Sequence, residues 1–282
     1  MQIFYRKKAL MDYLSSVKTT NSTIGFVPTM GALHKGHQSL MTQSTKENDF
    51  TVVSIFVNPT QFNNPDDLEK YPRTIEEDII KISQIDPNII VFAPDVEDMY
   101  EGKTQSQSFD FDGLENKMEG KFRPGHFDGV GTIVKLLFEI VQPTKAYFGE
   151  KDFQQVQIVK KMVTKNNLPV TIVMCPILRE TNNLAMSSRN ERLTLQNRNE
   201  AAIIYRTLKT AKEKFKNTSA QKTTQWVQNE FKDNKQFILE YFEIADEDTL
   251  TVCNRKEKNK KYRAFIAVFI DNVRLIDTIS LN

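Results

Sequence analysis

The stretch TIGFVPTMGALHKGHQSL, residues 23–40, runs from an apolar segment through a glycine-containing turn into a helical pattern. Residues 23–28 are mostly apolar, which predicts a short buried strand. Gly31 and Gly36 allow the backbone to approach a ligand closely. We expect the next helix to begin near Gly36 or His37, with its first amides at the end of the strand. A strand, a glycine turn and a helix in this order are typical of the anion-binding edge of an open α/β sheet.

Similar apolar runs recur along the first part of the chain, and helical patterns separate them. Further strands are expected at 51–57, 88–92, 145–148 and 170–174. Helices are expected at 75–85, 129–141 and 152–163. Near-continuous apolar strands that alternate with helices indicate a parallel sheet covered on both faces. The first part of the chain is therefore predicted to form an α/β doubly wound parallel sheet.

The pattern changes near residue 180. Two helices are expected at 191–216 and 219–232, and three strands at 237–245, 263–270 and 273–281. The dipeptide Asp271-Asn272 predicts a tight hairpin between the last two strands. Helices followed by antiparallel strands predict a smaller α+β domain. We therefore place two domains, at 1–179 and 180–282.

The composition is that of an ordinary globular protein, with 282 residues, 39% hydrophobic and 26% charged. No apolar run approaches the roughly 20 residues of a membrane span, and the N-terminus is not typical of a signal peptide. The net charge is only +2. The basic run RKEKNKKYR (255–263) is expected to be a solvated turn, not a nucleic-acid surface. Cys175 and Cys253 lie in apolar runs, which predicts buried free thiols and a cytoplasmic location.

Two of the three histidines, His34 and His37, lie in the opening turn. Histidines three apart can point at one ligand, donate hydrogen bonds to phosphate oxygens and stabilise charge on a transferring phosphoryl group. A zinc site and two incidental turn histidines are the alternatives. Zinc needs three or four ligands, and the chain offers only His126 besides and no cysteine cluster. A phosphate ligand is the favoured interpretation.

Other polar residues follow the predicted strands. In VNPTQF, the amide of Gln61 can donate to one group of a ligand and accept from another. In FGEKDFQQ, Lys151 offers a positive charge, Asp152 either caps a helix or binds a ribose hydroxyl, and Gln155 shares its helix face. Each also has a purely structural alternative, as a turn, cap or surface residue.

Three further groups complete the candidates. In AMSSRN, Ser187, Ser188 and Arg189 form either a phosphate clamp or a helix cap with a surface arginine. Asp78 opens a helix, where a carboxylate favours the helix dipole. In RPGHF, either Arg123 orients phosphates or the partner subunit, or Arg123 and His126 form a structural turn.

The string PTMGALHKGH (28–37) contains the His-x-Gly-His signature of the class I nucleotidyltransferase superfamily. Together with VNPTQF, FGEKDFQQ and MSSR, it resembles the pantothenate synthetase (pantoate–β-alanine ligase) family. The resemblance covers the N-terminal domain and the start of the second; the remainder is similar only in size and pattern. Arg189 stands where the wider superfamily has a lysine, as is usual within this family.

The resemblance implies a Rossmann-like ATP- and pantoate-binding domain with a lid domain. It implies ATP-dependent condensation of pantoate with β-alanine through pantoyl adenylate, with release of AMP and pyrophosphate, in the coenzyme A pathway. The implied cofactors are ATP, as a substrate, and Mg²⁺. The implied assembly is a cytoplasmic homodimer with small-molecule substrates and no nucleic-acid or membrane partner.

The resemblance also implies roles for particular residues. The catalytic residues would be His37, His34 and Lys151. Gln61 and Gln155 would hold pantoate and β-alanine, and Asp78 would lie near the metal. ATP would be bound by Met30, Gly31, Ala32, Leu33, His34, Lys35, Gly36, His37, Gly149, Glu150, Lys151, Asp152, Leu178, Met186, Ser187, Ser188 and Arg189.

Two other functions stay open at this point. One is another adenylyl- or cytidylyltransferase of the same superfamily, and the other is a nucleotide-sensing module without turnover. Gln61 and Gln155, with the strings around them, have no role in a bare nucleotide binder and therefore favour the ligase.

Overall fold

The computed structural model describes residues 1–282. The chain forms two compact units. The first unit consists of Met1–Gly149 and Gln155–Pro176. The second consists of Glu150–Gln154 and Ile177–Asn282. The short segment Glu150–Gln154 thus belongs to the second unit although the chain on both sides of it belongs to the first. The predicted roles of the two domains, a substrate-binding domain and a lid, stay predictions.

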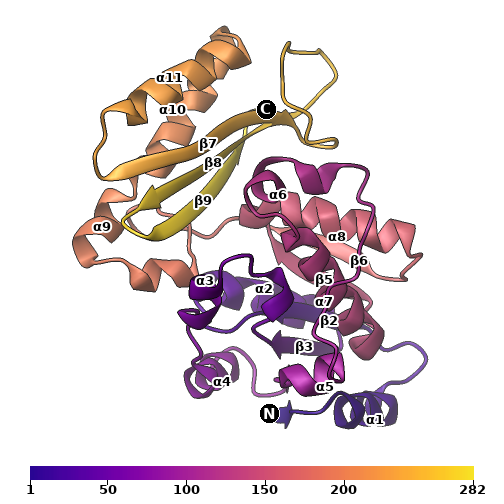
Figure 1. The fold of residues 1–282 in the computed structure, drawn as a ribbon. Coiled ribbons are helices and arrows are strands. Elements are labelled where there is room, and N and C mark those ends of the chain that lie inside the picture. The colour runs from indigo at the N-terminus through magenta and orange to yellow at the C-terminus, as the bar shows by residue number, and fades with distance from the viewer. The chain divides into compact units, whose positions relative to one another are not determined.

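A six-stranded sheet with the order β1-β4-β3-β2-β5-β6 forms the centre of the first unit (Figure 1). Its strands are β1 (Gln2–Phe4), β2 (Ile24–Thr29), β3 (Phe50–Ile55), β4 (Ile90–Phe92), β5 (Lys145–Gly149) and β6 (Thr171–Cys175). All neighbouring strands are parallel. The predicted doubly wound parallel sheet is confirmed. The three-residue edge strand β1 was not predicted, because so short a run carries no usable periodicity.

Helices cover both faces of this sheet. Adjacent residues of a strand point to opposite faces, and Val27 packs in a cluster with Leu40 and Met41 of α2 (Lys35–Glu47). On the other face, the ring of Phe26 lies 6.1 Å from that of Phe138 in α7 (His126–Val141). The other helices and 3₁₀ turns are α1 (Lys7–Val17), α3 (Pro65–Glu69), α4 (Ile75–Ser83), α5 (Val96–Tyr100), α6 (Met118–Phe122), α8 (Phe153–Lys165), η1 (Pro59–Gln61) and η2 (Leu114–Asn116).

The direction of winding reverses between β2 and β5. From β2 the chain proceeds through β3 to β4 on one side, and from β5 to β6 on the other. Ligands of open α/β sheets bind at such a switch point, outside the carboxyl ends of the strands. Thr29 and Gly149 end the two strands that flank it, so the turn that follows Thr29 is the first place to look for a site.

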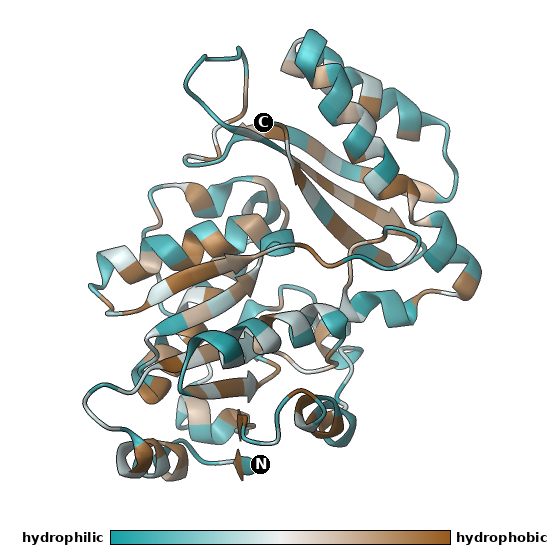
Figure 2. Ribbon diagram, turned by 180° about the vertical axis from the view of Figure 1, so that it is seen from behind, coloured by the Kyte–Doolittle hydropathy of each residue, from teal (hydrophilic) through white to brown (hydrophobic).

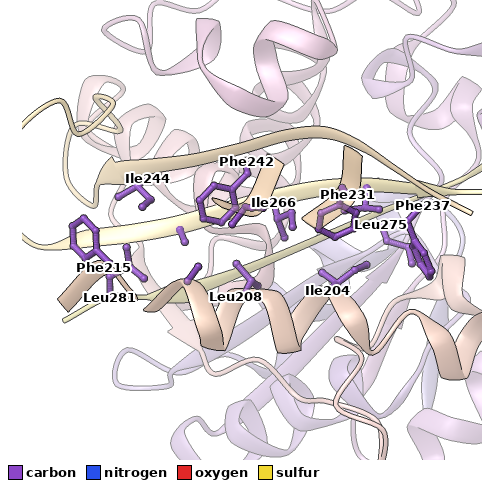
Figure 3. Close-up of a cluster of buried hydrophobic side chains, with 14 of the residues drawn as sticks. Ile204, Leu208, Phe215, Phe231, Phe237, Phe242, Ile244, Ile266, Leu275 and Leu281 are labelled. Atoms are coloured by element: carbon purple, nitrogen blue, oxygen red, sulfur yellow. The ribbon is translucent and has the colours of Figure 1, made fainter. Parts of the chain in front are cut away.

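A three-stranded antiparallel sheet forms the second unit together with helices. Its elements are η3 (Glu150–Asp152), η4 (Ser188–Arg192), α9 (Leu195–Glu200), α10 (Ile203–Asn217), α11 (Ala220–Lys232), β7 (Phe237–Asp246), β8 (Tyr262–Ile270) and β9 (Val273–Ser280). Side chains from α10, α11 and the strands form one buried cluster (Figure 3). The predicted α+β pattern and the hairpin at Asp271-Asn272 are confirmed.

Two sequence expectations in this unit were wrong. The single helix predicted over 191–216 is broken, because Thr194 caps a new helix by accepting a hydrogen bond from the amide of Asn197 (3.1 Å). The basic run 255–263 is exposed only up to Lys261. Tyr262 and Arg263 are buried in β8, so the strand predicted at 263–270 includes the end of the basic run and begins one residue earlier.

Apolar residues concentrate on the strands of both sheets, whereas the helices alternate hydrophilic and hydrophobic faces (Figure 2). None of the helices combines the length and the apolar content that a membrane span requires. Cys175 and Cys253 are buried free thiols, as predicted.

Candidate active site

The turn between β2 and α2 has an unusual backbone. Gly31 and Ala32 both have positive φ, 83° and 48°. This conformation is easy for glycine but unfavourable for alanine. A side chain at Gly31 would also bring its Cβ within 3.1 Å of the Asp78 carboxylate. The turn therefore requires Gly31, and Ala32 needs stabilisation from its surroundings.

Asp78 in α4 supplies that stabilisation. Its side chain is fully buried, and its two oxygens accept hydrogen bonds from the amides of Ala32 (2.9 Å) and Leu33 (2.7 Å). The hydroxyl of Thr74 also donates to it (3.2 Å). The carboxylate thus fixes the turn in front of the histidines. No group of three or more His, Cys, Asp or Glu side chains is placed to hold a metal ion, so the metal role of Asp78 stays a prediction.

His34 and His37 are held in place by backbone hydrogen bonds. The amide of Gly36 donates to Nδ1 of His34 (3.1 Å), and the amide of His34 donates to Nδ1 of His37 (3.4 Å). The ring centroids are 4.0 Å apart. Since each Nδ1 accepts, each neutral ring carries its proton on Nε2, the nitrogen that can donate to a phosphate. Helix α2 begins at Lys35, slightly earlier than expected, with His34 as its cap.

Gln61 lies beside this turn. It is buried at the end of η1, and its Nε2 donates to the sulfur of Met30 (3.1 Å). Asn58 orients the amide, because its Nδ2 donates to Oε1 of Gln61 (3.1 Å). The hydroxyls of Tyr100 and Thr60 in turn donate to Oδ1 of Asn58. The donor end of the Gln61 amide is thereby directed to the side of Met30.

Arg123 and His126 hold the backbone of Gln61. The Nδ1 of His126 lies 2.8 Å from the Gln61 carbonyl oxygen, and Nη2 of Arg123 donates to the same oxygen (3.4 Å). Gly129 in α7 comes so close that an added Cβ would lie 2.3 Å from the carbonyl oxygen of Thr60. Of the two interpretations left open for this pair, the contacts described favour the structural one.

Most of the other predicted residues lie in the second unit. Lys151 and Asp152 lie in η3, directly after Gly149, with Lys151 Nζ 3.8 Å from the Asp152 carboxylate. The side chain of Glu150 is bound by Arg263 (2.7 Å). Gln155 lies in the first turns of α8, in the first unit. Contacts with nucleotide or pantoate stay predictions for all four residues.

The loop before Ser187 is closed by a network around Glu180. Arg198 donates to both oxygens of Glu180 (2.8 and 3.0 Å), and the side-chain amide of Asn190 donates to it as well (2.7 Å). The amide of Met186 donates to the Leu178 carbonyl (3.0 Å). These bonds join the two ends of the loop and give Ser187–Arg189 a fixed base.

Next to this loop, Arg179 forms a bidentate ion pair with Asp277 (2.6 and 3.0 Å) and stacks on Tyr205. Within the loop, Ser187 Oγ accepts from the amide of Arg189 (3.3 Å), so Ser187 is the predicted cap, and Ser188 is buried. A cap contact and a phosphate contact are compatible, because a hydroxyl has more than one hydrogen-bonding direction.

Several residues of the site were not singled out from the sequence. Asn58 stands in the quoted string VNPTQF, one turn before Gln61. Its side-chain amide could therefore have been recognised from the sequence as a partner of Gln61. Tyr100 is 42 residues from Asn58 and Arg263 is 113 residues from Glu150. No local pattern connects such pairs.

A doubly wound sheet with two histidines at the first turn after a central strand defines the class: an α/β protein with a ligand-binding turn at its switch point. A family model described as pantoate-beta-alanine ligase matches residues 2–280, and the chain belongs to this family of amide-forming ligases.

Curated relatives agree with the family model. The chain is 64% identical over 281 residues to the pantothenate synthetase of Flavobacterium psychrophilum, with 100% of both chains covered. It is 57% identical over 282 residues to that of Christiangramia forsetii, again with 100% of both covered. The family resemblance expected from the motifs is confirmed.

Solved structures agree as well. The pantothenate synthetase of Thermus thermophilus is similar with a TM-score of 0.89 and 35% identity, over 100% of this chain and 99% of that one. A pantoate-beta-alanine ligase from Francisella tularensis, complexed with beta-gamma ATP and beta-alanine, is similar with a TM-score of 0.81 and 34% identity, over 100% and 98%.

Proposed function

We propose that this chain, as a pantoate–β-alanine ligase, condenses pantoate with β-alanine in two steps that consume ATP. The observation that carries the proposal is the contact between Gln61 and Met30, which lies within a chain matched by the family model over residues 2–280. This contact brings a fixed amide, suited to pantoate, beside the turn that carries His34 and His37. A protein that only bound nucleotide would have no use for such an amide.

The first step activates the carboxylate of pantoate. A carboxylate oxygen attacks the α-phosphorus of ATP, the bond to the bridging oxygen of the β-phosphate breaks, and pyrophosphate leaves. Negative charge builds up on the phosphate oxygens. The Nε2–H groups of His34 and His37 are the proposed donors to these oxygens, with His37 the favoured acid, because hydrogen bonds aimed at developing charge are the largest contributors to such catalysis.

The second step forms the amide. The amine of β-alanine attacks the acyl carbon of pantoyl adenylate, a proton is lost from the nitrogen, and AMP leaves. Gln61 and Gln155 are the proposed pantoate ligands, and Lys151, Ser187, Ser188 and Arg189 the proposed partners of the β- and γ-phosphates. Because water would hydrolyse the adenylate, we propose that the second unit acts as a lid.

ATP is the nucleotide substrate under this proposal, as in the F. tularensis ligase complexed with beta-gamma ATP. Mg²⁺ is proposed as the counter-ion of the triphosphate. Since no cluster of metal-binding side chains is present, we expect phosphate oxygens and water to supply most of its ligands, which is how Mg²⁺ usually binds to nucleotides. A homodimer and a cytoplasmic location, both implied by the family resemblance, are proposed as well.

The test is pantoate-dependent exchange of labelled pyrophosphate into ATP, with Mg²⁺ and without β-alanine. The two-step reaction predicts exchange, because adenylate formation is reversible. Exchange that needs no pantoate would favour another nucleotidyltransferase. ATP binding without any exchange would favour a sensing module.

A further inference from the structure

Arg263 is a buried charge inside the second unit. It lies in the central strand β8, and only 3% of its surface is exposed. Its Nε donates to Oε1 of Glu247 (3.1 Å), and its Nη2 donates to Oε1 of Glu150 (2.7 Å). Glu247 follows β7, the strand next to β8, whereas Glu150 is 113 residues away in the sequence. One guanidinium thus joins β8 to the turn η3.

A second pair of contacts fixes the other end of that turn. The guanidinium of Arg263 lies 4.2 Å from the centre of the Phe153 ring. The ring of Phe265 packs against Phe153 with centroids 5.9 Å apart, edge to face. Arg263 and Phe265 are two residues apart in β8 and therefore point to the same face of the sheet. This face holds both Glu150 and Phe153.

The two residues between these anchors are Lys151 and Asp152. The side chain of Lys151 is 17% exposed and that of Asp152 is 46% exposed. The contacts of Glu150 and Phe153 with β8 determine the course of the backbone through the turn. They therefore determine where the Lys151 ammonium lies.

The chemistry of Arg263 suits positioning better than stability. Its Nη1 is buried without a hydrogen-bond partner, and a buried ion pair with an unsatisfied nitrogen is a poor stabiliser. The planar fork of arginine nevertheless sets two carboxylates at fixed angles, which the single ammonium of a lysine does not do.

We propose that Arg263 is a positioning residue that holds η3 so that Lys151 meets the triphosphate of ATP. The proposal rests on the proposed function, in which Lys151 binds the β- and γ-phosphates. Arg263 itself does not touch the nucleotide; it acts through Glu150 and the backbone of the turn.

The test is a double-mutant cycle of Arg263→Lys and Lys151→Ala. ATP affinity is measured by calorimetry, and the KM values for ATP and pantoate by pyrophosphate exchange. Arg263→Lys is expected to weaken ATP about 10-fold, since small misplacements of a binding group are costly, and to leave the KM for pantoate unchanged. In the Lys151→Ala background it should weaken ATP less than about twofold. Equal fold-changes in both backgrounds would overturn the proposal.

Glu150→Ala and Glu247→Ala form a matched pair if Arg263→Lys does not fold. Each removes one carboxylate from the same guanidinium, but only Glu150 belongs to the turn of Lys151. Glu150→Ala is expected to raise the KM for ATP, and Glu247→Ala to leave it within about twofold. An equal rise in both variants would show a merely structural role.

Calorimetry separates this proposal from the proposed function. Wild-type protein that binds ATP but shows no pantoate-dependent exchange would refute the ligase reaction. The loss of affinity in Arg263→Lys, and its absence in the Lys151→Ala background, would still support the positioning role.

Discussion

The three histidines of the chain are held in two different tautomers. In His34 and His37, Nδ1 accepts from backbone amides, so the proton lies on Nε2. In His126, Nδ1 faces the Gln61 carbonyl and Nε2 faces Nη1 of Arg123 (3.1 Å). A carbonyl only accepts and a guanidinium only donates, so neutral His126 carries its proton on Nδ1. The same residue type thus presents Nε2–H for the proposed phosphate contacts in one place and supports the backbone in another.

Replacing His37 with alanine is expected to lower adenylate formation about 10²-fold, because one donor to the developing charge is lost. Pyrophosphate exchange measures the effect. His37→Asn is the control for folding, since its side-chain oxygen can still accept from the His34 amide. It should be as inactive as His37→Ala but retain the stability of the wild type. Near-wild-type exchange in either variant would refute the role of His37.

Replacing Gln61 with alanine is expected to raise the KM for pantoate about 10-fold or more, since a hydrogen bond to a charged group contributes about 1.5–3 kcal/mol. The KM for ATP should change much less. Steady-state kinetics in both substrates measure the two values, with the exposed residue Gln105 as the site of a control Gln→Ala change. Equal weakening of both substrates would show that Gln61 is not a pantoate ligand.

Among the elements, the turn before α2 depends most on a distant partner. Ala32 has an unfavourable φ of 48°. The carboxylate of Asp78 in α4 accepts hydrogen bonds from the amides of Ala32 and Leu33. The turn is therefore stable only when α4 is packed beside it. This dependence links the folding of α4 to the geometry of the two histidines.

Asp78→Asn is expected to lower the free energy of unfolding by about 2–3 kcal/mol, because the amide replaces one acceptor by a donor that faces a backbone N–H. Urea unfolding in EDTA measures the loss without any metal. Glu77→Gln is the matched control, since Glu77 is the neighbouring, exposed acid, and should be neutral. If instead Asp78→Asn altered only the Mg²⁺ requirement, Asp78 would be a metal ligand and not the support of the turn.

The strands β5 and β6 contain two groups that resist ionisation. Burial raises the pKa of Cys175 to about 11, with a further contribution from the charge of Glu47. Burial likewise raises the pKa of Tyr147 to about 12. The unfolded chain releases the Cys175 proton near pH 8.5, so the contribution of this group to stability is complete below that pH and declines as the pH rises to about 11.

Urea unfolding at several pH values between 8 and 11 should show this decline. The loss due to Cys175 is expected to be about 3 kcal/mol. Cys175→Ala removes the titrating thiol. The free energy of unfolding of this variant should therefore decline less than that of the wild type over the same pH range, by the amount due to Cys175. Identical declines in the variant and the wild type would mean that the thiol ionises equally in both states.

At the scale of the whole molecule, each unit has its own buried core, and each contains residues that the family resemblance assigns to ATP. A ligand that binds the folded chain raises its stability by mass action. ATP at about 100 times its Kd should add about 2.7 kcal/mol, which corresponds to a rise in Tm of roughly 5 °C. Thermal unfolding with CTP at the same concentration is the control. An equal rise with CTP would favour a cytidylyltransferase, and no rise with ATP would contradict nucleotide binding.

Much of the architecture follows from local features of the sequence. Apolar runs with the period of a strand, helical spacing between them, and the dipeptide Asp271-Asn272 are each encoded within a few residues. They predicted five of the strands of the parallel sheet and all three of the antiparallel sheet, at nearly the observed bounds. Motif residues such as His34, His37 and Gln61 follow these strands in the sequence, so the sequence also indicated this side of the candidate site.

The tertiary structure alone decided which distant residues support the site. Asp78 reaches the turn of Ala32, Tyr100 reaches Asn58, and Arg263 reaches Glu150, across 46, 42 and 113 residues. It likewise buried the last residues of the basic run, Tyr262 and Arg263. Periodicity and turn chemistry depend on neighbours along the chain, whereas these contacts depend on which faces pack together. That is why the sequence by itself determined most of the elements and the candidate reacting groups, and only packing decided what holds them in place.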